Sequence, residues 1–298
     1  MFAFRKLIVV GNGFDLAHGL NTRYSDFRIF LENYDSLSEN FKDKLTKYLF
    51  LEGDWSNIES SLSQLNFEEL CDDNSDLNVL DYADDNFKCS SYHDYPDAIK
   101  DGTSFIDKLP YYLKLWIKNI QCADIERKFS FIDNNSLYLS FNYTDTLERI
   151  YGINKNNILH IHGYSQTDDD LICGHCDSNI IQDSSGFETE DWEYMDFQID
   201  SVKHDYYNKS FKNERAIINK NKAFFENVNK NNINEIIIIG HSFEYDIDLI
   251  YFVHLTTIVS PVCKWTFTYY SESDKQNNER MIHTLNLCNY VNIHINQI

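Results

Sequence analysis

Proline is scarce in this chain, with three residues among 298, and no segment rich in proline, glycine or serine interrupts the sequence. Segments of that kind typically mark the linker between two domains, so their absence argues against a chain of separate modules. The length is sufficient for one large α/β domain or for two ordinary domains. We therefore predict a single α/β domain over residues 1–298 that carries an insertion.

Positive charge is also in short supply. Lys and Arg together number 26 against 47 Asp and Glu, which gives a formal net charge of −21. A surplus of that sign repels both duplex nucleic acid and anionic lipid. We therefore expect neither nucleic acid nor a membrane surface among the partners of this protein.

Long apolar runs are missing as well. No segment approaches the roughly 20 consecutive apolar residues that span a bilayer. The basic pair Arg5-Lys6 is followed by a run of only four apolar residues, LIVV, which is too short for the core of a signal peptide. These two features lead us to expect a cytoplasmic protein.

The seven cysteines are scattered, and Cys173 and Cys176, in the sequence CGHC, form their only close pair. A structural zinc site usually needs a second close pair. A redox pair is typical of the start of a helix in a thioredoxin-like unit, which this sequence does not indicate. We interpret the two cysteines as incidental and predict no metal site.

Four short apolar runs each end in a polar or glycine-containing cluster. They are Leu7 to Val10 before GNGFD, Leu137 to Phe141 before NYTD, Ile158 to Ile161 before HG, and Ile236 to Ile239 before GHSFEYD. The first and last are continuously apolar, as is typical of strands buried on both faces of a parallel sheet. Helical patterns follow at 144–151 and 247–253. The alternation predicts a Rossmann-like α/β fold, with a mostly parallel sheet and helices on both faces.

Residues 28–130 have a helical pattern, and we predict a helical insertion there. Within it Asp54 is a candidate N-cap for a helix that places Trp55, Ile58, Leu62 and Leu65 on one stripe. The acidic segment 71–85 and the polar segment 166–193 are weakly patterned and predict loops. Alternation in KWTFTYY and from Val291 to Ile295 predicts the last strands, the final one with one face in water.

The polar clusters at the four strand ends are the candidate site. Ligands of doubly wound sheets bind beyond the carboxyl ends of the strands, so four such clusters are expected to converge in one crevice. A glycine pair after a buried strand lets backbone approach a ligand, and a following helix would direct its N–H groups at phosphate. His162 ends its run before Gly163, where it can act as a general base. The expected binding residues are Gly11, Asn12, Gly13, Phe14, Asp15, His18, Tyr143, Thr144, His160, Gly163, Gly240, His241, Ser242 and Asp246, with Asn142 and His162 as catalytic residues.

Each of these residue types also has a purely structural interpretation. Gly11 and Gly13 suit a tight strand-to-helix turn, and Leu16 stands where a dinucleotide fingerprint has its third glycine. Asn142 suits a turn, although Thr144 or Asp145 is available to cap the following helix. Ser242 and the nearby Asp246 and Asp248 suit helix caps. His160 and His162 would share one face of a strand, and the inner His160 suits a hydrogen-bonded core position.

Taken together, VVGNGFDLAHGLNTRYSDF, WSNIE, FNYTDTLE, HIHG and IIIGHSFEYD resemble the AbiH family of bacterial abortive-infection proteins, which act against phage. AbiH proteins are in turn distantly similar to sirtuin-like NAD-binding domains. In those domains a Gly-rich turn, an Asn-containing strand end, a His-Gly and a Gly-x-Ser build one NAD pocket. The resemblance places Gly11 with Gly13, Asn142, His162 with Gly163, and Gly240 with Ser242 in these roles.

The resemblance implies an anti-phage effector that binds NAD or a related nucleotide and hydrolyses it with release of nicotinamide. Asn142 would orient the ribose or a water, His162 would accept a proton, and Asp15 would lie near ribose hydroxyls. A small-molecule nucleotide is the expected partner, together with a homo-oligomer or a phage-derived trigger. Two alternatives stay open: a metal-dependent nuclease or phosphoesterase using His160, His162, His241, Asp15 and Asp246, and a non-catalytic nucleotide sensor.

Overall fold

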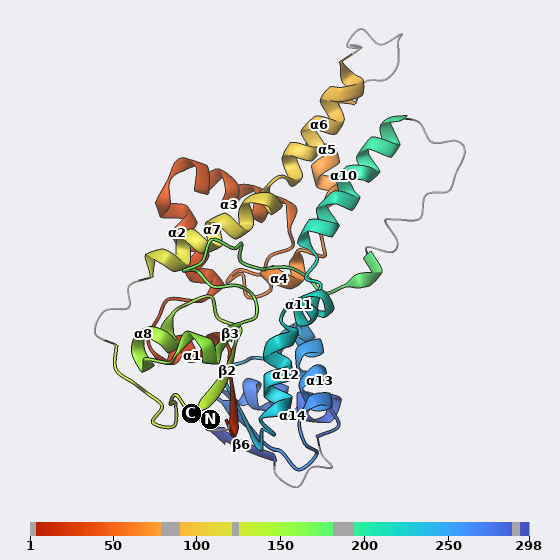
Figure 1. The fold of residues 1–298 in the computed structure, drawn as a ribbon. Coiled ribbons are helices and arrows are strands. Elements are labelled where there is room, and N and C mark those ends of the chain that lie inside the picture. The colour runs from red at the N-terminus through yellow and green to blue at the C-terminus, as the bar shows by residue number, and fades with distance from the viewer. Residues whose placement is uncertain (1–3, 79–89, 121–124, 181–193, 288–292, 298) are drawn as a thin grey trace. The chain divides into compact units, whose positions relative to one another are not determined.

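A computed structural model describes residues 4–78, 90–120, 125–180, 194–287 and 293–297 of the chain (Figure 1). Its contacts divide the chain into two compact units. The sheet unit comprises Met1–Arg23, Lys114–Ile172 and Asn213–Ile298, and the helical unit comprises Tyr24–Leu113 and Cys173–Lys212.

The sheet unit is built on six parallel strands in the order β3-β2-β1-β4-β5-β6. The strands are β1 Lys6–Val10, β2 Ser136–Ser140, β3 Ile158–His160, β4 Glu235–Ile239, β5 Lys264–Tyr269 and β6 Ile293–Gln297. From β1 the chain first adds strands on one side and then, from β4 onward, on the other. The strand order therefore reverses between β1 and β4, and at such a point the connections on either side diverge and leave room for a ligand.

Helices pack on both faces of this sheet (Figure 1). The helical elements of the unit are α1 Asn12–Ala17, α8 Thr146–Tyr151, η2 Lys155–Asn157, α11 Glu214–Lys220, α12 Lys222–Lys230, η3 Glu244–Asp246, α13 Leu249–Ile258 and α14 Glu272–Thr284. One core lies under α1 and α8, and the other lies under α11 to α14. These two layers confirm the predicted α/β class.

The continuous apolar runs are explained by these two cores. Leu7 and Val9 of β1 belong to the core under α11 to α14, whereas Ile8 and Val10 belong to the core under α1 and α8. Successive side chains of a strand point to opposite faces, so a strand covered on both faces must be apolar at every position. All four of these side chains are at most 1% exposed.

The helical unit is formed by two separate segments of the chain. Its elements are α2 Tyr24–Tyr34, α3 Ser36–Tyr48, α4 Ile58–Ser61, α5 Phe67–Asp72, η1 Ser75–Leu77, α6 Ser91–Thr103, α7 Phe105–Asn119, which begins in this unit, and α10 Tyr194–Ser210. In Figure 1 α10 lies alongside α6. The insertion expected over 28–130 covers most of the first segment. The second segment, Cys173–Lys212, was not part of that prediction, and it begins within the predicted loop 166–193.

The stripe predicted from Asp54 is buried but is not one helix. Trp55, Ile58, Leu62 and Leu65 are all at most 7% exposed, as the pattern indicated. However, α4 is only four residues long, and Trp55 has a left-handed backbone with φ of 61°. Asp54 accepts the N–H of Ser56 and holds a turn instead of capping a helix. Burial was therefore predicted correctly and conformation was not.

The predicted loops contain short helical elements where the structure describes them. The acidic segment 71–85 includes the end of α5 and the short η1, and its residues 79–85 lie outside the described residues. The same holds for residues 181–193 of the predicted loop 166–193, and for the side chains of the final strand β6, whose predicted wet face is therefore not described.

Candidate functional site

The clusters predicted at the strand ends meet at one edge of the sheet. The strands β3, β2, β1 and β4 are neighbours and run parallel, so the residues after each strand lie on the same side. Asp15, Asn142 and His162 are 1%, 8% and 3% exposed, respectively. The strand-end site is therefore a packed polar cluster that lies entirely within the sheet unit.

The turn after β1 packs directly on the turn after β4. A Cβ on Gly11 would lie 2.7 Å from the carbonyl oxygen of Gly240, and one on Gly13 would lie 2.7 Å from Gly240 Cα. Gly240 has φ of 64°, and its own Cβ would lie 2.3 Å from the nitrogen of Phe14. The three positions need glycine because backbone meets backbone there.

The backbone N–H groups that the sequence predicted to bind phosphate form hydrogen bonds within the protein instead. Gly13 N–H donates to the carbonyl of Gly240 at 2.8 Å, and Phe14 N–H donates to that of Gly11 at 2.9 Å. Asn12 directs its side-chain amide to the carbonyl of Thr22 at 2.8 Å. The Phe14 side chain is fully buried under the sheet. The turn thus joins β1 to β4 and does not direct these N–H groups at a phosphate.

Asn142 connects β2 to β1. Its Nδ2 donates to the carbonyl of Gly11 at 3.0 Å. It also hydrogen-bonds Asp15, which helps to lower the pKa of that carboxyl group. A structural role for this amide is therefore established by its contacts, whatever else the residue does.

Asp15 lies between two threonine hydroxyls. Thr144 donates to Oδ2 at 2.6 Å and Thr146 donates to Oδ1 at 2.7 Å. Burial raises the pKa of Asp15 from 3.8 to about 6, because the charged form loses its hydration and the hydrogen bonds only partly compensate. Thr144 is thus held by Asp15, and Asp145, the N-cap of α8, makes no side-chain capping bond and pairs with Arg149 instead.

His160 and His162 do not share a face, because β3 ends at His160. His160 Nδ1 lies 3.0 Å from the carbonyl oxygen of Asn142, Nε2 lies 3.1 Å from Glu148 Oε1, and the ring stacks on Tyr164. His160 therefore has the hydrogen-bonded structural position that was the alternative to a binding role. His162, beyond the strand, packs edge-on against Phe141 and faces Asp248.

Asp248 is the carboxylate around which the histidines gather. Its Oδ1 lies 3.4 Å from His162 Nε2, and its Oδ2 lies 3.2 Å from His241 Nε2. Asp248 is also the N-cap residue of α13, yet its side chain makes no capping bond to that helix. A carboxylate that approaches two imidazoles can fix the orientation of both rings and stabilise a proton on either.

The sequence analysis placed Asp246, two positions earlier, in the site. The structure directs Asp246 to Arg280, with Oδ2 3.0 Å from Nη1, and leaves it exposed. The two carboxylates differ only in where a short 3₁₀ turn and a left-handed backbone at Asp246 place them. Sequence spacing carries no signal for that difference. Ser242 is exposed and accepts the N–H of Glu244 at 3.4 Å.

The remaining predicted residues have structural contacts. Tyr143 donates its hydroxyl proton to the carbonyl of Ile172 at 2.7 Å, and Gly163 packs against the backbone of Asp170. His18 lies in the core under α1, where Tyr151 OH approaches Nε2 at 2.8 Å and Phe14 O approaches Nδ1 at 2.7 Å. Burial lowers the pKa of His18, which keeps its ring neutral. Both of its ring nitrogens are engaged away from the cluster of Asp248.

The residues proposed as metal ligands do not form a ligand group. Within the described ranges, no three His, Cys, Asp or Glu side chains are arranged to hold a metal ion. Neither Cys173 nor Cys176 is in a disulfide bond, and burial raises the pKa of Cys173 well above its ordinary value. A thiol of that kind is a poor nucleophile.

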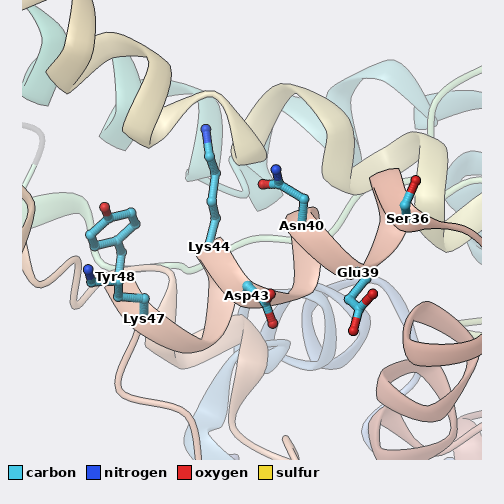
Figure 2. Close-up of a pocket in the computed structure, with 7 residues that line it drawn as sticks. All are labelled: Ser36, Glu39, Asn40, Asp43, Lys44, Lys47 and Tyr48. Carbon is cyan, nitrogen blue, oxygen red and sulfur yellow. The ribbon is translucent and has the colours of Figure 1, made fainter.

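A cavity of about 350 Å³ lies elsewhere, along one face of α3 in the helical unit (Figure 2). Its lining residues are Ser36, Glu39, Asn40, Asp43, Lys44, Lys47 and Tyr48. They recur every three or four positions, as one face of a helix requires. Several are already engaged, since Lys44 binds Asp101 and the Tyr48 hydroxyl donates to Asp73. Nothing about this mixed-charge groove connects it to the strand-end site.

The known family that this chain matches is described as bacteriophage abortive infection AbiH. The match covers residues 7–269, from β1 through β5. The chain belongs to the AbiH family. Membership implies a role in abortive infection by bacteriophage, as the sequence motifs indicated. A search of curated proteins finds no match.

The match spans all the strand ends of this AbiH protein that contribute to the site. It also includes both segments of the helical unit. Over the part of the chain that the structure describes, no helix is both long enough and apolar enough to cross a membrane.

Proposed function

We propose that this AbiH protein is an abortive-infection effector that hydrolyses a nucleotide at the strand-end site, with NAD as the first candidate substrate. The observation that carries the proposal is the placement of His162 against Asp248 at the carboxyl edge of the sheet. An imidazole that a carboxylate orients is a suitable general base for water. The strand order, with its reversal between β1 and β4, is one found in dinucleotide-binding sheets and supports a nucleotide as the ligand.

The proposed reaction breaks the glycosidic bond between nicotinamide and ribose. Water attacks C1′ of the ribose as nicotinamide leaves with the bonding electron pair, and His162 takes the proton that the water releases. The products are nicotinamide, ADP-ribose and a proton. Such an oxocarbenium-like transition state needs positioning more than covalent help. Positioning by His162 and its neighbours is therefore the contribution that this site can make.

In this proposal the turn after β1 is a structural part of the site and does not donate hydrogen bonds to phosphate. Gly13 N–H and Phe14 N–H already donate within the protein, and a backbone carbonyl occupies the space beside Gly11. The pyrophosphate of a dinucleotide would need other donors. The proposal therefore rests on the reacting end of the substrate, and a smaller nucleoside-containing substrate is compatible with it.

The proposal is tested by measuring NAD in phage-infected cells by mass spectrometry. We expect NAD to fall in cells with the wild-type protein and to persist with His162→Gln, because a general base contributes about 10²- to 10⁴-fold to the rate. His254→Gln is the matched control: His254 also packs edge-on against a phenylalanine, Phe225, but it lies where α13 packs on α12. It should deplete NAD like the wild type.

Asn142→Ala is a weaker test, because its amide holds Gly11 and its loss affects folding as well as chemistry. Two results would contradict the proposal. Protection against phage with NAD intact in wild-type cells would exclude NAD as substrate. Depletion by His162→Gln at the wild-type rate would exclude His162 as the base.

A further inference from the structure

The connections that follow β3, β2, β1 and β4 carry acidic side chains and no basic one. Residues 11–15, 141–146, 161–165 and 240–248 contain no Lys and no Arg. Their acidic residues are Asp15, Asp145, Glu244, Asp246 and Asp248. Sites that bind phosphate usually supply arginine or lysine side chains, because these cations match the charge of the phosphate oxygens. The strand-end site is therefore built from residues that are unusual for a phosphate site.

Two arginines from the helices α8 and α14 reach these connections, and each of them meets a carboxylate there. Arg149 Nη2 lies 2.6 Å from Asp145 Oδ2, and Arg280 Nη1 lies 3.0 Å from Asp246 Oδ2. An arginine in such a pair cancels one negative charge and adds no net positive charge to the site. Neither arginine therefore reverses the sign of the charge at the strand ends.

Asp248 brings a negative charge next to His162, the proposed base. Its Oδ1 lies 3.4 Å from His162 Nε2, its Oδ2 lies 3.2 Å from His241 Nε2, and its side chain is only 16% exposed. Two neutral imidazoles leave this charge in place, and a proton on one of them would cancel it without reversing its sign. The helix α13 also begins at Asp248, so the partial positive charge at the start of that helix lies beside a carboxylate.

The backbone of the same turns does not supply the missing positive charge. Gly13 N–H donates to the carbonyl of Gly240 at 2.8 Å. Phe243 N–H donates to the ring of His241 at 3.2 Å. N–H groups that are paired in this way cannot serve a phosphate, and the carbonyl oxygens of these turns carry partial negative charge. Backbone and side chains together favour a cation over an anion at this edge of the sheet.

We propose that the strand-end site selects ribosides with a positively charged base and disfavours phosphate on the reacting ribose. The inference rests on the proposed function and ranks its substrates, with nicotinamide riboside ahead of NAD. The pyridinium ring of nicotinamide is cationic until the glycosidic bond breaks, and the positive charge then passes to the ribose. The carboxylate of Asp248 favours both states. A 5′-phosphate instead brings a like charge toward the same carboxylate.

The reaction on nicotinamide riboside is the same hydrolysis that we propose for NAD. Water adds its oxygen to C1′, nicotinamide leaves as a neutral molecule with the bonding electron pair, and the products are ribose, nicotinamide and a proton. A nucleoside with an uncharged base, such as inosine, lacks this neutral leaving group. Its base would leave as an anion near Asp248, so the site should discriminate against inosine as well.

The ranking is measured as kcat/KM with the full chain purified from phage-infected cells. The substrates are nicotinamide riboside, nicotinamide mononucleotide, NAD and inosine at about pH 8, where the phosphate of the mononucleotide carries close to two charges. The riboside should exceed the mononucleotide by about 100-fold, because bringing like charges together costs at least that much. NAD should lie between them, because its proximal phosphate carries a single charge. Inosine should release no base above the level seen with His162→Gln.

The outcomes separate this inference from the proposed function. Release of nicotinamide by the wild type and not by His162→Gln supports the proposed function. If the mononucleotide or NAD is then cleaved as fast as the riboside, the ranking is overturned while the proposed function stands. Inosine cleaved as fast as the riboside would also overturn the ranking. If none of the four compounds is cleaved, the proposed function fails, and the ranking fails with it.

Asp248→Asn tests the source of the selectivity. Removing this charge should lower the ratio of kcat/KM for the riboside over the mononucleotide by about tenfold. A ratio taken within one variant cancels any general loss of folded protein. Glu244→Gln is the matched control, because Glu244 is an exposed carboxylate on the same connection and solvent screens its charge, so the ratio should stay at the wild-type level. An unchanged ratio in Asp248→Asn would overturn the role of Asp248.

Discussion

The sheet unit buries the carboxylate of Asp15, the helical unit half-buries that of Glu59, and the two groups are hydrogen-bonded in different ways. In the sheet unit Asp15 is 1% exposed and is held by the neutral hydroxyls of Thr144 and Thr146. In the helical unit Glu59 accepts from Lys212 Nζ at 2.9 Å and from the Tyr24 hydroxyl at 2.7 Å, and the Lys212 side chain is fully buried.

The difference lies in whether a buried charge is matched by an opposite charge. Hydroxyl donors stabilise a carboxylate but do not neutralise it, so burial raises the pKa of Asp15 to about 6. A cation at hydrogen-bond distance matches the charge of Glu59 directly. The charge of Asp15 is therefore electrostatically unfavourable in the folded sheet unit. The ion pair of Glu59 with Lys212 joins the two segments of the helical unit.

The largest effect is expected from removing the buried cation. Lys212→Met leaves Glu59 without its opposite charge and should lower the free energy of unfolding by about 3 kcal/mol, the lower end of the range for a broken buried pair. Glu59 keeps 18% exposure, which moderates the loss. Urea unfolding measures it.

Lys209→Met is the matched control, because Lys209 is 39% exposed and pairs with Asp107 and Asp205 at the surface. Its cost should stay below about 1 kcal/mol. Adding Glu59→Gln to Lys212→Met should recover part of the loss. Equal stability of the two lysine variants would show that the buried pair of Glu59 and Lys212 contributes no more than a surface pair.

An effect of opposite sign is expected at Asp15. Asp15→Asn removes a charge that the folded state disfavours and should raise the free energy of unfolding by about 2 kcal/mol at pH 7.5. Glu59→Gln, at the same pH, should lower it, because it removes the negative charge that pairs with the buried ammonium group of Lys212. The same acid-to-amide change should therefore raise the free energy of unfolding in the sheet unit and lower it in the helical unit. Changes of the same sign would contradict the comparison of the two units.

The effect at Asp15 must depend on pH. A carboxyl group whose pKa is raised by folding binds its proton more tightly in the folded state, so its contribution is favourable below its ordinary pKa of 3.8 and is lost as the pH rises to about 6. The advantage of Asp15→Asn should therefore fall to a small remainder at about pH 4. An advantage that persists unchanged at that pH would show that Asp15 is not protonated in the fold.

The smallest effect is expected from one hydroxyl. Thr146→Val removes the donor to Asp15 Oδ1 and should cost about 1 kcal/mol at pH 7.5, and less at low pH where Asp15 is protonated. Thr284→Val removes an exposed hydroxyl that bonds its own helix at Arg280, and it should change stability by less than about 0.5 kcal/mol. Equal costs for the two variants would contradict the role of Thr146.

The sequence analysis located all six strands, each within two residues at either described end, because apolar runs and alternation are local features. It predicted a loop over 166–193 and no helix after it, because α10 has little apolar pattern of its own and packs against α6. The four strands whose ends it grouped are parallel neighbours, so these ends lie at one edge of the sheet. It chose Asp246 over Asp248, because the backbone turn that separates them is not visible in residue type.

By itself the sequence determined the α/β class, the strand ends that meet and the AbiH family, because periodicity and motif are written in the order of residues. Only the tertiary structure decided what the motif residues do. The glycines of the first turn pack against Gly240, Asn142 holds Gly11, and Asp248 lies between two histidines. These pairings join positions far apart in the chain, and their distances exist only once the sheet has brought the strand ends together.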